Sequence, residues 1–296
     1  MGETASGKSA LAEAIAAELG GQLINADAFQ VYRGLDIGTS KPVDRARYEL
    51  LDLKNPDEPF GAGEWVQLAA NSVRRAVASG RSAILVGGTG FYIRALLEGY
   101  DAMSPPGDPA RREELNALFQ AEGLEPLLNL LESRSQELFG QVDRKNPARV
   151  IRAIERSENP STSAPPELPA VPRLKLAIRR PVDVLDARIV RRTQEMFTAG
   201  WVKEVECLRA SGYEVSAPGL RAIGYRTIWD HLEHRLDLAE AIATTIATTR
   251  RYAKRQRTWL RTEPKLVTLD AKPLPELLGD AMSAIRSRSV GGNEIG

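Results

Sequence analysis

Residues 2–9, with the sequence GETASGKS, constrain the fold of this chain more than any other segment. Two glycines, separated by four residues and followed by lysine and serine, form the pattern of a phosphate-binding P-loop. The glycines let the backbone turn tightly, so successive N–H groups point at phosphate oxygens, and the following helix presents its positive end. We therefore expect the phosphate to be bound by Gly2, Glu3, Thr4, Ala5, Ser6, Gly7, Lys8 and Ser9.

Two side chains of the loop have separate expected roles. Lys8 supplies a positive charge to the terminal phosphates, and the Ser9 hydroxyl can bind Mg²⁺. The pattern indicates a phosphate chain but not its chemistry, because a kinase, a GTPase and a transferase that releases diphosphate would all fit. The alternative is a glycine-rich turn that only resembles a P-loop.

The strand that normally precedes a P-loop has no counterpart in this sequence, because only Met1 stands before Gly2. That strand is usually central, and its neighbours would lose hydrogen bonds and a packed face without it. We therefore expect the natural protein to begin several residues earlier. Mass analysis of the native N-terminus would test this expectation.

Strand and helix patterns alternate along much of the chain, which is typical of an α/β fold with a mostly parallel sheet. The clearest buried strand is the apolar run at 82–90, which ends in a glycine turn. We expect a P-loop NTPase-like core flanked by helices. Its strands are predicted at 21–27, 82–90, 173–178 and 265–270, and its helices at 9–19, 64–79, 91–99, 183–211 and 237–261.

The predicted secondary structure changes along the chain and divides it into three parts. Residues 110–155 are helical in pattern and almost free of strand signal, and a linker rich in proline and serine follows at 159–172. We predict an α/β core at 1–106, an inserted all-helical domain at 107–172 and a return to the core at 173–296.

The overall composition excludes several classes of protein. The net charge is +1, so only local clusters of charge can indicate a partner. The single cysteine excludes a disulfide framework and a cysteine-rich metal site. No apolar run is long enough to span a membrane and the N-terminus lacks the pattern of a signal peptide, so we expect a cytoplasmic protein without a membrane partner.

Further motifs follow the P-loop in a fixed order. They are NADAFQVYRGLDIGTSKP (25–42), VGGTGFYIRALLEG (86–99), DRKNPARVIRAIE (143–155), LRAIGYR (220–226) and TRRYAKRQRTWLR (249–261). Together they resemble the tRNA dimethylallyltransferase family, also called tRNA isopentenyltransferases, over nearly the whole chain. The resemblance implies transfer of a dimethylallyl group from its diphosphate to the exocyclic amine of the adenosine 3′ of the anticodon.

The same resemblance implies the ligands and partners. The P-loop would hold dimethylallyl diphosphate with Mg²⁺, where related folds hold a nucleoside triphosphate. The macromolecular partner would be the anticodon stem-loop of tRNA. We expect the enzyme to act as a monomer.

Three residues are expected to be catalytic. Asp27 follows a strand and would take the proton of the adenosine amine, its alternative being a Mg²⁺-side or helix-capping acid. Thr89 would contact the target nucleotide beside Asp27, which is compatible with capping the next helix. Arg112 matches a family arginine near the diphosphate or the tRNA, and a solvated arginine is the alternative.

Basic side chains indicate where tRNA binds. Arg250, Lys254 and Arg257 fall on one stripe of a helix with few acids to balance them, which favours the phosphate backbone over a solvated face. Gln30 could bond a base edge or be a satisfied buried amide, and Tyr225 could stack on an extruded base. The predicted tRNA-binding residues are Asp27, Ala28, Phe29, Gln30, Ala148, Arg149, Val150, Ile151, Arg152, Gly224, Tyr225, Arg226, Arg250, Lys254 and Arg257.

Some residues depart from the family pattern. Glu3 stands where proline is usual, and a carboxylate beside a diphosphate is unfavourable unless it points away. Ala28 replaces a usual serine, which removes one hydroxyl contact. These departures bear on the level of activity more than on the family.

Three other functions compete with the transferase. An adenylate isopentenyltransferase acts on a free nucleotide and would not need the basic stripe or the helical insert. A small-molecule kinase would use ATP but leaves the later motifs unexplained. An inactive tRNA-binding relic would bind phosphate and tRNA without turnover.

Overall fold

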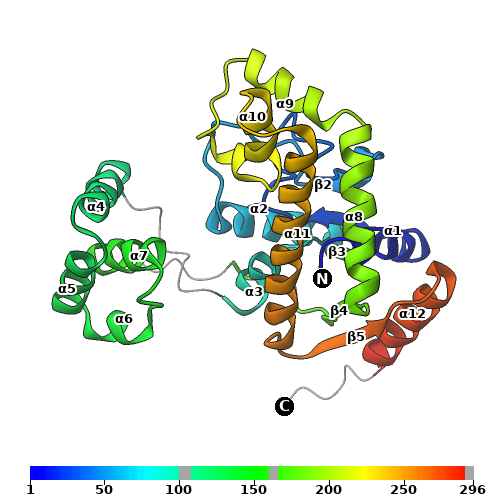
Figure 1. Cartoon of the computed structure of the whole chain (residues 1–296). Coiled ribbons are helices and arrows are strands. Elements are labelled where there is room, and N and C mark those ends of the chain that lie inside the picture. The colour runs from blue at the N-terminus through cyan, green and yellow to red at the C-terminus, as the bar shows by residue number, and fades with distance from the viewer. Residues whose placement is uncertain (100–107, 160–165, 291–296) are drawn as a thin grey trace. The chain divides into compact units, whose positions relative to one another are not determined.

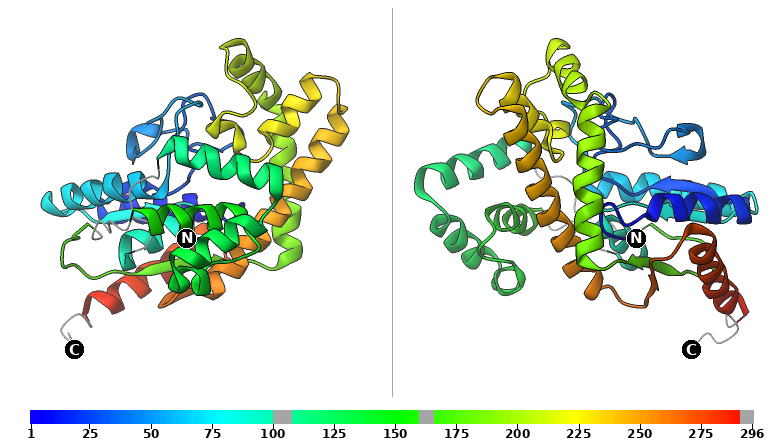
Figure 2. Two further views of the ribbon diagram at one scale, coloured as in Figure 1. Left: turned by 90° about the vertical axis from the view of Figure 1, so that its left-hand side faces the viewer. Right: turned by 45° about the vertical axis from the view of Figure 1, so that its right-hand side comes forward.

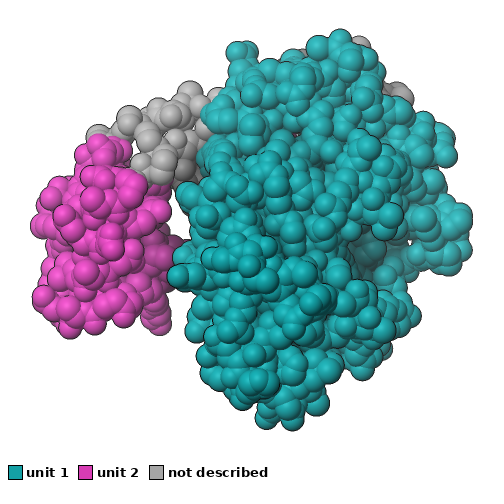
Figure 3. Space-filling model, turned by 90° about the horizontal axis from the view of Figure 1, so that it is seen from above, with its two compact units in different colours: residues 1–96, 166–296 teal, residues 97–165 magenta. Residues whose placement is uncertain are grey.

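The computed structural model describes residues 1–99, 108–159 and 166–290. It divides into two compact units, residues 1–96 with 166–296 and residues 97–165, which are coloured teal and magenta in Figure 3. The first unit carries the sheets and the P-loop, and the second is all-helical (Figure 1). None of the helices in the described ranges is long and apolar enough to cross a membrane.

The N-terminal part of the chain forms a parallel sheet with helices around it. Its elements are α1 (Lys8–Leu19), β1 (Gln22–Asn25), η1 (Arg45–Arg47), β2 (Tyr48–Glu49), α2 (Ala62–Ala78), β3 (Ala83–Val86) and α3 (Gly90–Glu98). The strand order is β2-β1-β3, and the register places Leu23 beside Ile84. Gly20 ends α1 with a φ of 58°, the left-handed conformation that favours glycine. The predicted α/β fold with a parallel sheet is confirmed.

A second parallel sheet pairs β4 (Lys175–Arg179) with β5 (Leu266–Asp270). The sequence predicted that the strand at 173–178 would rejoin the first sheet, but within the described ranges β3 and β4 do not pair. Gly2 instead forms a parallel bridge with Ile178, and the Met1 amino group donates to the Leu176 carbonyl at 2.7 Å. The start of the P-loop is therefore held by the second sheet.

The C-terminal half of the first unit is mostly helical. Its helices are α8 (Val182–Thr198), α9 (Trp201–Ala210), η3 (Pro218–Arg221), α10 (Tyr225–Leu232), α11 (Leu238–Arg261) and α12 (Leu274–Val290). The helix predicted at 183–211 is broken by Gly200, whose φ is 101°. Helices α8 and α11 lie side by side in both figures that show the ribbon (Figures 1 and 2). Asp237 and Glu240 form a capping box that starts α11.

The second unit has its own hydrophobic core. Its helices are α4 (Pro109–Glu122), α5 (Glu125–Arg134), α6 (Gln136–Gln141) and α7 (Pro147–Glu158). Val150 and Ile151 lie in this core with Leu115, Leu127 and Leu131. Their side chains are the buried face of an amphipathic helix, and the contact of these two residues with tRNA stays a prediction.

The bounds of the insert differ from the predicted ones. The compact unit is 97–165, not 107–172. Residue 167 already belongs to the first unit, where its carbonyl accepts a hydrogen bond from Arg74 Nε at 3.1 Å. The predicted boundary between 106 and 107, like part of the predicted linker at 160–165, lies outside the described residues.

Candidate functional site

Two arginines donate hydrogen bonds to carbonyl groups of the P-loop. Arg180 Nε donates to the carbonyl of Ser6 at 2.7 Å, and Arg188 Nε donates to the carbonyl of Ala5 at 2.8 Å. Gly7 has a φ of 98°, so the turn into α1 requires a residue without a side chain there. The N–H groups of Thr4 and Ser6 bond the Gln256 side chain and the Glu3 carbonyl, so the other N–H groups of the loop are those available to an anion.

A polar cavity of about 330 Å³ opens over the loop. Lys8 and Ser9 line it on one side, and Arg188, Arg191 and Arg192 of α8 line it on the other. Burial, and next the charge of Arg192, lower the pKa of Lys8 to about 8, against an opposing effect of Asp27. Burial also lowers the pKa of Arg192. Cations that repel one another in an enclosed space favour a polyanion as the occupant.

Asp27 lies where β1 ends, with one carboxylate oxygen occupied and one available. Its Oδ1 accepts the N–H of Phe29 at 3.0 Å, and its own N–H donates to Asn25 Oδ1 at 3.1 Å. The Thr89 hydroxyl accepts the N–H of Ala28 at 3.1 Å and so ties the ends of β1 and β3 together. No other donor among the described residues bonds Asp27, so Oδ2 is available to a ligand.

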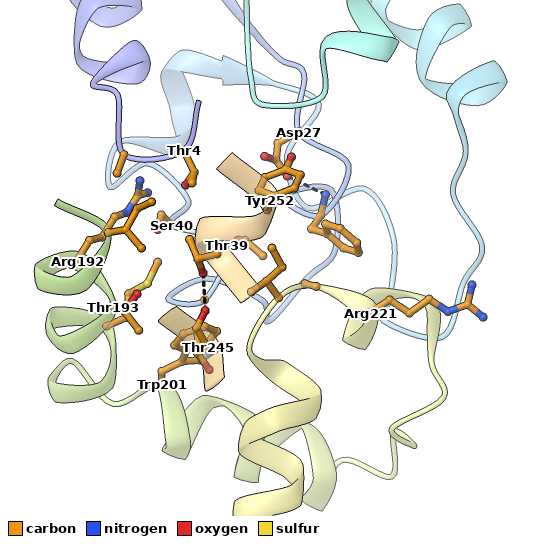
Figure 4. A pocket seen from close by; sticks show the side chains of 18 of the residues that line it. Thr4, Asp27, Thr39, Ser40, Arg192, Thr193, Trp201, Arg221, Thr245 and Tyr252 are labelled. Atoms are coloured by element: carbon orange, nitrogen blue, oxygen red, sulfur yellow. Dashed lines mark hydrogen bonds between the residues drawn. The ribbon is translucent and has the colours of Figure 1, made fainter. Parts of the chain in front are cut away.

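A second cavity, of about 270 Å³, adjoins the first (Figure 4). Much of its wall is apolar and comes from Ile189, Met196, Trp201 and Ile223. Thr4 and Arg192 lie on one side of this cavity and Arg221 lies on the other. Asp27 lines both cavities, so its carboxylate stands where a polar chamber meets a mainly apolar one.

A third cavity of about 230 Å³ lies beyond Tyr252. Phe91 and Trp259 line it, with ring centroids 6.4 Å apart, and Gln256 borders it. The Gln256 side chain accepts the N–H of Thr4 at 2.7 Å and donates to the Gly88 carbonyl at 2.9 Å. This single amide therefore joins α11 to the P-loop and to the turn after β3.

Comparison with known proteins assigns this site to a family. A family model described as IPP transferase matches residues 30–263. The chain belongs to the IPP transferase family. A tRNA dimethylallyltransferase of Salinispora arenicola is 36% identical over 97% of this chain and 85% of its own length. One from Gloeobacter violaceus is 38% identical, over 91% of this chain and 90% of its own.

Solved structures agree with the family. The tRNA isopentenylpyrophosphate transferase of Bacillus halodurans is 30% identical and matches with a TM-score of 0.72, over 98% of this chain and 95% of that one. A eukaryotic dimethylallyltransferase acting on tRNA matches with a TM-score of 0.79 over 99% of this chain and 79% of that one. At 19% identity, this second likeness bears on the fold alone. The family resemblance predicted from the motifs is thus confirmed.

The ring of Tyr225, which was expected to stack on an extruded base, lies in the core. Tyr225 is 0% exposed, and its hydroxyl donates to Glu204 Oε1 at 2.6 Å. Its ring packs edge-on against Trp201 with centroids 5.6 Å apart. The burial of this ring speaks against stacking on a base, which stays an untested prediction. Tyr252, to which the sequence motifs assigned no role, is one of the rings that line the cavity beside Asp27.

Gln30 was expected either to bond a base edge or to be an amide satisfied within the protein, and the structure shows its amide group bonded within the protein. Its amide donates to the carbonyls of Thr39 and Ser40 at 2.9 and 3.1 Å. These bonds use the donors that would read a base edge. Gln30 instead fixes the loop at residues 39–40, which lines both cavities.

Part of the predicted basic stripe on α11 is neutralised. Arg257 Nε donates to Glu3 Oε1 at 2.6 Å, and Arg250 Nε lies 3.5 Å from Asp186 Oδ2. Glu3 thus points away from the phosphate site, which is the orientation that its unusual position requires. Lys254 is exposed and makes no ion pair among the described residues, so it remains the freest cation of the stripe.

The predicted residues of the insert pair with acids of the same unit. Arg112 bonds both oxygens of Glu155 at 2.6 Å through Nε and Nη2, and Arg152 bonds the same carboxylate. Arg149 is exposed and lies 3.1 Å from Asp143. Ala148 is exposed at the start of α7. The catalytic role of Arg112 stays a prediction, and its structural partner is Glu155.

The sequence motifs did not single out the arginines that follow β4 or lie on α8. Arg188 and Arg192 are four residues apart on α8, which places both on the face that meets the P-loop. The four-residue spacing of these arginines is visible in the segment RRPVDVLDARIVRR (179–192). Only the packing of α8 against the loop distinguishes these arginines from the many solvated ones.

Proposed function

We propose that this chain transfers the dimethylallyl group of dimethylallyl diphosphate to the exocyclic amine of the adenosine 3′ of the anticodon in tRNA. The carrying observation is the position of Asp27, with a free carboxylate oxygen where the cationic cavity meets the mainly apolar one. A diphosphate fits the first cavity and a short hydrocarbon fits the second. Membership of the IPP transferase family and the printed names of its relatives support the same reaction.

The reaction forms one bond and breaks one bond. The adenosine nitrogen attacks C1 of the dimethylallyl group, the C1–O bond breaks and its electron pair stays on the diphosphate. Lys8, Arg188 and Arg192 stabilise the charge that develops on the leaving group, together with the loop N–H groups. Asp27 takes the proton that the nitrogen loses.

The oxygen-rich donor set suits Mg²⁺. Ser9 lines the cationic cavity, and its hydroxyl together with phosphate oxygens would supply the hard ligands that this ion prefers. No cluster of three or more His, Cys, Asp or Glu that could hold a metal occurs in the described ranges, so the ion would depend on the bound diphosphate. When bound, Mg²⁺ supplies further charge neutralisation to the leaving group.

The adenosine must leave its stack in the anticodon loop to reach Asp27. The side of the second cavity marked by Arg221, opposite Thr4 and Arg192, is the entrance that suits it (Figure 4). Tyr252 offers a ring for stacking inside the cavity. Arg226 and Lys254 are exposed cations for the RNA backbone.

Transfer of labelled dimethylallyl groups to an unmodified anticodon stem-loop, with Mg²⁺, tests the proposal. Asp27→Asn keeps the shape of the side chain but not its basicity, so we expect kcat to fall by about 100-fold or more. Asp280→Asn is the matched control, because Asp280 pairs with Lys272 at 2.8 Å and takes no part in either cavity. Equal rates in the two variants would contradict the role of Asp27.

The choice of acceptor separates the competing functions. Label that enters AMP but not the stem-loop would identify an adenylate isopentenyltransferase. Stem-loop binding without label in either acceptor would identify the non-catalytic relic. Label confined to the stem-loop is the expected result.

A further inference from the structure

The two cavities over the P-loop meet along a short boundary. The residues that line both are Thr4, Ala5, Asp27, Thr39, Ser40 and Arg192. If the diphosphate fills one cavity and the hydrocarbon the other, as the proposed function requires, the C1–O bond lies at this boundary. A side chain there is placed to act on the bond that breaks.

Ser40 is a boundary residue whose hydroxyl, like that of Thr4, is available to bind. Its backbone N–H donates to the Ile37 carbonyl at 3.0 Å and its carbonyl accepts from Gln30 Nε2 at 3.1 Å. The hydroxyl itself bonds no described residue. The neighbouring Thr39 hydroxyl differs, because it donates to the Leu35 carbonyl at 2.5 Å.

The backbone of Ser40 is in an unusual conformation. Its φ is +52°, in the left-handed region that residues other than glycine, asparagine and aspartate seldom adopt. A turn of this kind is more stable with glycine, which has no Cβ to be crowded. Strain of this kind persists where surrounding contacts enforce it, and it gathers at functional sites.

The surrounding contacts here form a clamp on residues 36–41. On one side Glu204 accepts the N–H groups of Asp36, Ile37 and Gly38 at 2.9, 2.6 and 3.3 Å. On the other side Lys41 donates to Asp36 at 2.9 Å and to Asp52 at 2.5 Å, with its side chain only 1% exposed. The clamp therefore fixes the backbone of this loop, including Ser40, before any substrate arrives.

We propose that Ser40 is a further catalytic residue, which donates a hydrogen bond to the ester oxygen that joins C1 to the diphosphate as the C1–O bond breaks. The electron pair of that bond stays on this oxygen, and the hydroxyl stabilises the charge that develops there. The serine keeps its own proton, and the proton lost by the adenosine nitrogen still goes to Asp27. A donor on a backbone that is fixed before the reaction needs little reorganisation in the transition state.

Two variants separate this role from a structural one. Ser40→Ala removes the hydroxyl and keeps the strained backbone, whereas Ser40→Gly removes the hydroxyl and relieves the strain. We expect both to lower kcat by about 10- to 100-fold, with the KM for the stem-loop almost unchanged. We expect Ser40→Gly, but not Ser40→Ala, to raise Tm by about 1–3 °C.

Titration with inorganic diphosphate and Mg²⁺ gives a second readout that does not depend on turnover. Both variants should bind diphosphate more weakly than the wild type, because the free product carries the oxygen that Ser40 contacts. Ser211→Ala is the matched control, since the Ser211 hydroxyl only caps α9 by donating to the Cys207 carbonyl at 2.9 Å. It should leave both readouts unchanged.

The possible failures are distinguishable. If the wild type labels RNA and Ser40→Gly keeps full kcat and diphosphate affinity, the proposal for Ser40 is wrong while the transferase stands. If the wild type labels no RNA, the proposed function fails. In that case unchanged diphosphate affinity in both variants would also overturn the role of Ser40.

Discussion

At the scale of the residue, the cationic cavity brings several positive charges close together. Lys8 and Arg192 are partly buried, and the charge of Arg192 disfavours the charged form of Lys8 as the charge of Arg188 disfavours that of Arg192. A bound diphosphate offsets this repulsion. Diphosphate binding should therefore raise the stability of the folded enzyme. Glu3 and Arg257 show the opposite case, because the buried carboxylate and its guanidinium neutralise each other.

The pKa of Lys8 predicts a pH dependence for diphosphate binding. Protonated Lys8 attracts the anion, so the affinity should be highest below about pH 8 and should fall as the pH rises through that value. In the Lys8→Met variant this dependence should be lost along with most of the affinity. Calorimetric titration with diphosphate between pH 6 and about 9.5 would measure both.

In the enzyme without ligand, the lowered pKa of Lys8 makes stability rise with pH, whereas diphosphate affinity falls with pH. Between about 8 and the ordinary 10.5, the unfolded chain holds a proton on Lys8 that the folded chain has lost. The contribution of Lys8 to stability therefore becomes more favourable as the pH rises through this window. Lys8→Met should raise Tm at pH 7, and a lower Tm would contradict the assignment.

At the scale of the element, α9 and α10 determine the shape of the second cavity although they bring no charged group into it. Trp201 at the start of α9 packs on Gly38 and on Tyr225 at the start of α10. A methyl group at Gly38 would lie 2.2 Å from Nε1 of Trp201, and one at Gly224 would lie 2.1 Å from its six-membered ring. Both glycines are therefore required by the indole.

Gly38→Ala should change the shape of the second cavity, which Gly38 and Trp201 both line. The added methyl group must displace Trp201, so we expect a loss of about 1–3 kcal/mol in the free energy of unfolding and a lower kcat. Gly63→Ala in α2 is the matched control, because nothing lies within 4 Å of the new methyl group. That control should gain about 0.5–1 kcal/mol through its helix propensity and keep its activity. Chemical denaturation and the transfer assay would measure the two effects.

At the scale of the whole molecule, the first unit is built on two separate parallel sheets, and the start of the P-loop is bonded to the second of them. Met1 and Gly2 lie along β4, while β3 has no partner on that side among the described residues. Edge strands with unpaired N–H and C=O groups are a structural liability. The site depends on this region, because the P-loop leaves from Gly2.

An added strand should therefore stabilise the enzyme. We expect a fusion of about five β-branched residues ahead of Met1 to pair along β4 and raise Tm, with tighter diphosphate binding. A fusion of the same length made of glycine and serine is the control, since it cannot pack an apolar face. Equal Tm values for the two fusions would contradict the prediction.

The sequence by itself determined the features that depend on short range. The P-loop, the strand that leads to Asp27, the glycine turn before Thr89 and the capped helix at Leu238–Arg261 all follow from spacing, apolar runs and turn residues. The family followed from the order of the motifs. These signals are local, so they survive without knowledge of the packing.

Only the tertiary structure decided which side chains meet. Glu3 and Arg257 are 254 positions apart, and Arg188 meets Ala5 across 183 positions. Tyr225 looked like an exposed ring and is core, whereas Ser40 looked like a loop residue and is held at the junction of two cavities. Burial and long-range pairing arise from the sum of many weak contacts, so no short pattern in the chain encodes them.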